Sequence, residues 1–108
     1  MNKILKNKTK MKTAKTITVI PIHRTGGSKI GLLQTMYHDI VSKIFEPNVT
    51  DIDDSEKVKA SWGFEDADGR QGFIWCYKYY GKIENCNQWS VDSDRSLLTE
   101  LFGDKVTF

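Results

Sequence analysis

Residues 58–80 read Val58-Lys-Ala-Ser-Trp-Gly-Phe-Glu-Asp-Ala-Asp-Gly-Arg-Gln-Gly-Phe-Ile-Trp-Cys-Tyr-Lys-Tyr-Tyr80. Apolar and polar side chains alternate over 58–64, which is the pattern of a half-buried β-strand. Residues 65–70 form the connection of a hairpin, in which Asp68-Gly69 supplies the positive φ angles of a tight turn. The return strand, 71–80, is apolar on both faces for most of its length, so we expect it to be central in an antiparallel sheet.

An edge strand and a helix precede this hairpin. Residues 16–22 are rich in β-branched side chains, and Pro21 cannot donate to a strand ladder, which predicts an edge strand or a strand end. Ser28 is a good N-cap for a helix over 29–45, and Pro47 ends that helix. The helix has apolar side chains at helical spacing: Ile30, Leu33, Met36, Tyr37, Ile40, Val41 and Ile44.

A short strand and a second helix follow the hairpin. Residues 88–91 form the strand, Ser93 or Asp94 caps the helix, and Gly103 ends it. The apolar stripe of this helix consists of Leu97, Leu98, Leu101 and Phe102. The sequence therefore predicts an α+β fold with the order β-α-β-β-β-α. The three consecutive strands form an antiparallel meander, and both helices pack on one face of the sheet.

Charge divides the chain into a tail and a body. Six of the 16 basic residues lie in 1–15, which contain no acid, so ten basic residues face 14 acidic residues in 16–108. We expect 1–15 to be a flexible basic tail and 16–108 to be one domain of ordinary size. A mildly acidic body does not favour binding to a phosphate backbone. The tail is either a solvated extension or an arm that binds nucleic acid.

The cysteine content and hydropathy indicate an intracellular protein. Cys76 and Cys86 do not form the disulfide framework of a small secreted protein. The basic N-terminus is not followed by the apolar run of a signal peptide, and no stretch is long enough to span a membrane. We expect a cytoplasmic location, free thiols and no contact with a membrane.

No pattern of residues nominates an enzyme or a metal site. The spacing of His23, His38, Cys76 and Cys86 does not match a zinc site, and no nucleophile lies beside a base in the sequence. The acidic run 51–56 lacks the glycine and the distant glutamate of a calcium loop. We therefore expect no catalytic residue, no metal and no cofactor.

A glycine-rich turn is the first candidate for ligand binding. Gly26, Gly27 and Ser28 lie between the predicted edge strand and the predicted helix, where backbone amides and the helix dipole favour an anion. Arg24 and Lys29 flank the turn and would add positive charge. A flexible turn with an N-cap explains the same residues without a ligand.

A set of aromatic side chains is the second candidate. It comprises Trp62, Phe64, Phe73, Trp75, Tyr77, Tyr79 and Trp89. Most of them can form the core, yet they exceed what two helices readily cover, so some are expected at a ligand site or an oligomer interface. We select Trp75, Tyr77, Tyr79 and Trp89 as candidates for stacking on a base, with Lys78 as a phosphate contact.

The chain also resembles small accessory proteins encoded by bacteriophages and prophages. The resemblance covers about three quarters of the chain, and its residues are Val58-Lys59-Ala60-Ser61-Trp62, Asp68-Gly69, Phe73-Ile74-Trp75-Cys76-Tyr77-Lys78, Asn87-Gln88-Trp89-Ser90-Val91, and Phe45-Glu46-Pro47-Asn48 at the end of the first helix. It implies a protein that counters the defence of the host cell, and it carries over no catalytic residue.

Together these features lead to three alternative functions. The first is a non-catalytic binder that sequesters a nucleotide-type immune signal, with a homo-oligomer completing the pocket. The second is an inhibitor that presents its acidic body, such as 51–56, to a basic surface of a host defence protein, for example a nuclease. The third is nucleic-acid binding through the lysine-rich tail.

Overall fold

The computed structural model describes residues 17–22, 28–47, 60–77, 79 and 81–108. The basic tail 1–15 and the acidic run 51–56 lie outside these residues, so the predictions that rest on them stay predictions. Across the described ranges, no helix has the length and apolar character needed to cross a membrane.

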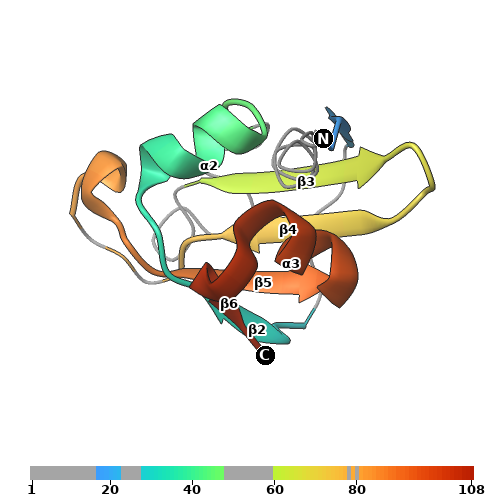
Figure 1. The fold of residues 1–108 in the computed structure, drawn as a ribbon. Helices are drawn as coiled ribbons and strands as arrows, with labels where there is room; N and C mark the ends of the chain where they lie inside the picture. The colour runs from blue at the N-terminus through green and yellow to red at the C-terminus, as the bar shows by residue number, and fades with distance from the viewer. Residues whose placement is uncertain (1–16, 23–27, 48–59, 78, 80) are drawn as a thin grey trace, which may run out of the picture.

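A six-stranded antiparallel sheet forms the centre of the fold (Figure 1). The strands are β1 (Val19–Pro21), β2 (Gly31–Leu33), β3 (Ser61–Asp66), β4 (Gln71–Trp75), β5 (Trp89–Ser93) and β6 (Val106–Thr107). Their order across the sheet is β1-β3-β4-β5-β2-β6, and every neighbouring pair is antiparallel. The predicted meander of three consecutive strands is thus confirmed as β3-β4-β5, with β4 in the interior and β1 at an edge.

Among the described residues, two helices cover one face of this sheet, α2 (Tyr37–Lys43) and α3 (Arg95–Phe102) (Figure 1). A short 3₁₀ turn, η1 (Ile83–Asn85), lies between β4 and β5, and another, η2 (Gly103–Lys105), lies between α3 and β6. Ile40 of α2 belongs to the same buried cluster as the apolar residues of α3, which are Leu97, Leu98 and Phe102. The expected α+β fold with both helices on one face is confirmed.

The side chains of the covered face come from alternate positions on each strand. Strand register places Trp62, Ile74, Val91 and Gly31 side by side, and the next row contains Trp89 and Leu33. Trp62 is fully buried and Trp89 is 1% exposed. Their rings meet edge to face with centroids 5.3 Å apart, a favoured geometry for aromatic pairs.

Both buried indoles are satisfied by the backbone on either side of α2. The Trp89 Nε1–H donates to the Thr35 carbonyl at 2.8 Å, and the Trp62 Nε1–H donates to the Phe45 carbonyl at 2.7 Å. Tyr37 lies against both indoles, with centroid distances of 5.9 and 6.4 Å. The sheet therefore fixes the start and the end of α2 through two hydrogen bonds.

The predicted helix over 29–45 was wrong in its first half. Residues 31–33 form β2, between β5 and β6, and the helix begins only at Tyr37. The N-cap is Met36 rather than Ser28. Gly31 explains the difference, because a Cβ there would collide with the Thr107 carbonyl, so the site suits close strand packing. Glycine also disfavours a helix.

Two further elements differ from the expected order. The strand β6 was not predicted, since its two residues carry no periodic pattern, and the order found is β-β-α-β-β-β-α-β. The return strand of the hairpin ends at Trp75 rather than at residue 80. The strand predicted over 88–91 is β5, which runs from Trp89 to Ser93 and so ends two residues beyond the predicted end.

The hairpin between β3 and β4 turns with one positive φ angle rather than two. Only Gly69 has a positive φ, at 84°, while the Gly69 amide donates to the Asp66 carbonyl. This is the geometry of a turn followed by a glycine bulge. Asp66 stabilises the turn, because its Oδ1 accepts from the amides of Asp68 and Arg70.

The second helix has the predicted ends. Asp94 is the N-cap, and its carboxylate accepts from the Leu97 amide at 3.0 Å. The hydrogen bond from Ser96, together with that from the Leu97 amide, lowers the pKa of Asp94. Gly103 ends the helix with a φ of 60°, a conformation that favours glycine.

The hydrogen bond from Trp62 can be tested by replacing the indole. We expect Trp62→Phe to lower the free energy of unfolding by about 2–4 kcal/mol, because it leaves the Phe45 carbonyl without its donor and removes buried volume. Urea unfolding measures the loss. Trp75→Phe is the control, since Trp75 is half-buried on the opposite face, and we expect it to cost less than about 1 kcal/mol. Equal losses in the two variants would contradict this role for Trp62.

Close packing at Gly72 gives a second test. Gly72 lies opposite Phe64, and a Cβ at Gly72 would come within 2.5 Å of the Phe64 ring. We expect Gly72→Ala to destabilise the fold by about 1–3 kcal/mol through overpacking. In a double-mutant cycle, Phe64→Leu should relieve part of that cost, since leucine leaves room for the new methyl group. Strictly additive losses would show that the Phe64 ring is not the obstacle.

Candidate functional site

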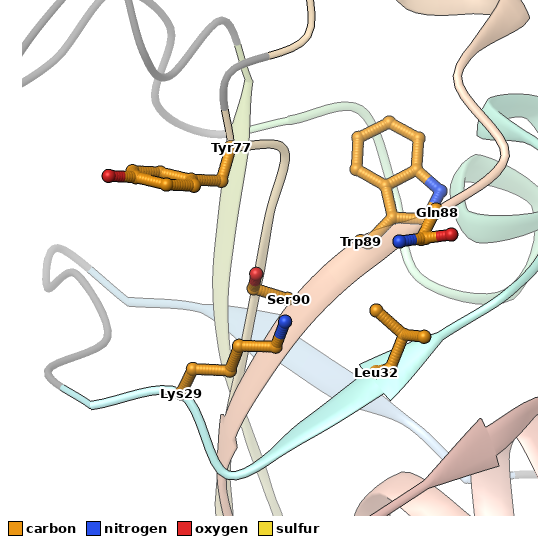
Figure 2. Close-up of a pocket in the computed structure, with 6 residues that line it drawn as sticks. All are labelled: Lys29, Leu32, Tyr77, Gln88, Trp89 and Ser90. Carbon is orange, nitrogen blue, oxygen red and sulfur yellow. The ribbon is translucent and has the colours of Figure 1, made fainter.

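A recess of about 180 Å³ opens near one end of the sheet (Figure 2). Its described lining consists of Lys29, Leu32, Tyr77, Gln88, Trp89 and Ser90. These residues come from three parts of the chain that the sheet brings together, which are β2 with the residues before it, the segment after β4, and β5 with the residue before it.

Strand pairing explains how the recess is built. Leu32 of β2 lies opposite Ser90 of β5, and Ser90 lies opposite Trp75 of β4. All three therefore project from the face of the sheet opposite α2 and α3. Tyr77 follows the end of β4 and Gln88 precedes β5, so both stand where this pair of strands stops.

The recess combines one cation with neutral polar groups and an aromatic ring. Lys29 and Gln88 are exposed, and the Tyr77 side chain is 52% exposed. Within the described part of the chain, Lys29 has no ion-pair partner. An unpaired ammonium group, a hydroxyl at Ser90 and an amide at Gln88 are suited to hold an anion and to hydrogen-bond a polar ligand.

The lining side chains come from different directions. Figure 2 shows the Lys29 side chain extending toward Ser90, with Tyr77 on one side of this pair and Gln88 on the other. In this view the Tyr77 ring, the Lys29–Ser90 pair and the Gln88 amide stand at three corners of the recess. The cation, the aromatic ring and the amide are therefore separate points of contact for a ligand.

The structure brings together three of the residues selected from the sequence, Lys29, Tyr77 and Trp89. Trp89 forms only the floor, since it is 1% exposed and its ring packs into the core. The other selected residues take different places. Trp75 is half-buried beside the recess, Tyr79 packs against the core cluster, and Ser28 is exposed. Arg24, Gly26, Gly27 and Lys78 lie outside the described residues.

Sequence reasoning missed Leu32, Gln88 and Ser90. Leu32 was assigned to a helix, where it fell off the apolar stripe. In β2, Leu32 and Leu33 point to opposite faces of the sheet, and only Leu33 is fully buried. Gln88 and Ser90 flank Trp89 in a strand that was correctly expected, and the polar side chains on both sides of a buried tryptophan were a usable signal.

Two physical premises of the predicted site need correction. The segment before Lys29 does not lead into a helix, because β2 follows it, so no helix dipole is available there to bind an anion. The aromatic set is also divided between two faces of the sheet. Trp62, Phe64 and Trp89 are buried under the helices, whereas Phe73 and Trp75 project to the other side.

The structure places Cys86 and His38 in different surroundings. Cys86 is buried, and burial raises the pKa of its thiol, which donates to the Gln88 carbonyl at 3.2 Å. A protonated, buried thiol is a poor nucleophile. His38 is an exposed residue of α2. Among the described residues, no group of three or more histidine, cysteine or acidic side chains is placed to hold a metal ion.

A second hollow of about 280 Å³ lies beside the hairpin turn and α3. Arg70 dominates it, with its guanidinium 2.7 Å from Asp66 and 2.8 Å from Glu100 of α3. Burial alone would raise the pKa of Asp66, but hydrogen bonds from Arg70 and Asp68 outweigh that effect and lower it. Because these charges satisfy one another, the hollow is a structural joint between the hairpin and α3.

Comparison with known proteins gives no relative for this chain. No family model matches it, and no curated protein or solved structure is similar enough to count as a match. The interpretation of the recess therefore rests on its own geometry and chemistry.

The joint at Arg70 predicts how stability depends on pH. The pKa of Asp66 is lower in the folded protein than in the unfolded chain, where it is about 4. The ionised carboxylate therefore contributes its full stabilisation above the unfolded pKa, and this stabilisation is lost as the pH falls through the pKa of the folded state. The stability difference between the native chain and Asp66→Asn should therefore shrink from pH 5 to pH 2, as measured by urea unfolding. Asp68→Asn, at an exposed position of the same turn, is the control. A difference that stays constant over this range would contradict the prediction.

Proposed function

We propose that this chain is a phage accessory protein that sequesters a nucleotide-type immune signal in the host cytoplasm, without catalysis. The recess of Lys29, Leu32, Tyr77, Gln88, Trp89 and Ser90 is the proposed binding site. One observation supports it above the others. A cation without an ion-pair partner among the described residues and an exposed aromatic ring, far apart in the sequence, line the same recess.

The proposed ligand uses both of these groups. A base stacks on the exposed ring of Tyr77, which is worth about 1–3 kcal/mol per base in proteins that bind single strands. A phosphate lies between Lys29 and Ser90, where the ammonium group and the hydroxyl both donate hydrogen bonds. The side-by-side position of these two groups in Figure 2 supports this part of the proposal.

The size of the recess supports an assembly of more than one copy. About 180 Å³ is less than the roughly 300–1,000 Å³ of pockets that enclose a drug-sized ligand. A ligand held there by one copy would keep much of its surface in water. A homo-oligomer in which a second copy covers the ligand would supply the missing burial.

The chemistry of the lining supports binding rather than turnover. The described lining contains no carboxylate, histidine or thiol, which are the groups that most often act as a nucleophile or general base. The inhibitor and nucleic-acid alternatives depend on 51–56 and on the tail 1–15, and no observation on the described residues favours either of them.

Native mass spectrometry tests the proposal directly. The protein is purified from bacteria with active nucleotide-based immunity and is weighed before and after denaturation. We expect an added mass that matches a small nucleotide and is released on denaturation, together with the size of the assembly. A clean mass of the chain alone from such cells, with no binding in a nucleotide screen, would overturn the proposal.

The role of Lys29 gives a mutational prediction. We expect Lys29→Gln to weaken nucleotide binding by about tenfold or more, because the variant removes the only cation of the described lining. Isothermal titration calorimetry measures the change. Lys82→Gln is the matched control, since Lys82 is an exposed lysine that precedes η1 and does not line the recess. Equal weakening in both variants would point to a general charge effect instead of a site at Lys29.

A further inference from the structure

We infer that the outer edge of β6 pairs with the same edge of a second copy of this chain, so that two sheets join into one continuous antiparallel sheet. This interface specifies a surface for the assembly that the proposed function calls for. It rests on the two edges of the sheet and not on a ligand, so its test can fail while the proposed function stands.

The backbone of β6 turns two residues away from the rest of the sheet. β6 is antiparallel to β2, and the Gln34 amide donates to the Lys105 carbonyl at 2.8 Å. Backbone groups alternate in direction along an antiparallel strand. Lys105 and Thr107 therefore face β2, whereas Val106 and Phe108 face outward.

The outward edge offers both an acceptor and a donor. The Val106 amide donates to the Gly103 carbonyl within η2. Within the described part of the chain, the Val106 carbonyl and the Phe108 amide have no hydrogen-bond partner. An edge with free groups of both kinds is a template for a further strand.

The opposite edge of the sheet, formed by β1, is poorly suited to such pairing (Figure 1). The Ile22 amide donates to the Gly63 carbonyl at 3.0 Å, so the same alternation turns Val19 and Pro21 outward. Proline has no N–H to donate, and this is a common way to block an edge. Because only the β6 edge is open, two copies that pair there form a closed dimer rather than a growing chain of sheets.

A two-fold axis through Thr107 makes the β6 edge complementary to itself. With Thr107 opposite Thr107 of the second copy, the Phe108 amide of each copy donates to the Val106 carbonyl of the other. The two threonines lie side by side on the face opposite the helices, and threonine pairs are favourable at such positions.

The side chain of Phe108 supports the same arrangement. Its ring covers Gly31, where a Cβ would come within 2.7 Å of it, and the Arg95 guanidinium lies 5.2 Å from the ring centroid. These neighbours hold the ring in place, yet it remains 46% exposed. In the pair, Phe108 lies opposite Val106 of the second copy and loses exposed apolar surface.

The pairing places the second copy beside the recess. Leu32, which lines the recess, lies opposite Thr107 on the same face of the sheet. Strands are spaced about 4.8 Å apart, so β6 of the second copy lies about 10 Å from β2. The two-fold axis is perpendicular to the sheet, and the recesses of both copies therefore open on the same face of the dimer.

A charge pair on the two-fold axis tests this register. Thr107 is exposed, and we expect Thr107→Lys and Thr107→Glu each to weaken self-association about fivefold or more, because like charges then lie opposite each other. An equimolar mixture of the two variants should favour the mixed dimer, in which a lysine faces a glutamate. Native mass spectrometry without nucleotide resolves the dimers by mass. A mixed dimer no more abundant than random pairing gives would overturn the inference.

The Phe108 amide gives a second test with a matched control. Phe108→Ala and Phe108→Pro both remove the ring, but only proline also removes the outward N–H. We expect Phe108→Pro to weaken dimerisation at least about fivefold more than Phe108→Ala in sedimentation equilibrium. Thermal unfolding checks that both variants fold.

Two outcomes of these measurements would contradict the interface. They are equal weakening by Phe108→Ala and Phe108→Pro, and a native chain that stays monomeric at about 100 µM. Nucleotide binding by that monomer would leave the proposed function standing.

Discussion

Two hydrogen bonds from buried indoles hold the helical layer of this protein in place. Trp62 and Trp89 come from strands that are not neighbours in the sheet, and they donate to the backbone just after and just before α2. A helix of seven residues is too short to be stable alone, so α2 depends on these anchors and on the burial of Ile40. One of these two tryptophans, Trp89, also forms the floor of the recess, so its side chain belongs both to the core and to the candidate site.

The division of the sheet into two unlike faces determines where binding can occur. One face is covered by α2 and α3 and carries the large apolar residues, including Phe64. The opposite face carries Leu32 and Ser90 in neighbouring positions, and the segments beyond the strand ends add Lys29 and Tyr77. A polar recess is compatible with this position because Lys29, Tyr77 and Gln88 remain in contact with water and do not have to be satisfied by the core.

The sequence was informative where local patterns and tertiary packing agree. The meander, the helix from Arg95 to Phe102 and its caps were predictable, because alternation, an apolar stripe and capping residues all indicate the same structure. The β2 strand was not, since a tertiary pairing with β5 and β6 overrides the helical spacing of apolar residues around it. Lys29, Tyr77 and Trp89 were selected as site residues, but only strand register shows that Leu32, Gln88 and Ser90 join them.

The place of β2 in the sheet has a consequence for folding during synthesis. Both of its neighbours, β5 and β6, lie far downstream, and β6 ends at Thr107. When β1, β3 and β4 have left the ribosome and can already pair, Gly31–Leu33 still has no strand to join. At about 5–20 residues per second, the segment waits for seconds with Leu33 outside a core. Completion of the sheet is therefore coupled to the synthesis of β5 and β6, and a nascent protein is most vulnerable to chaperone capture or proteolysis before these two strands emerge.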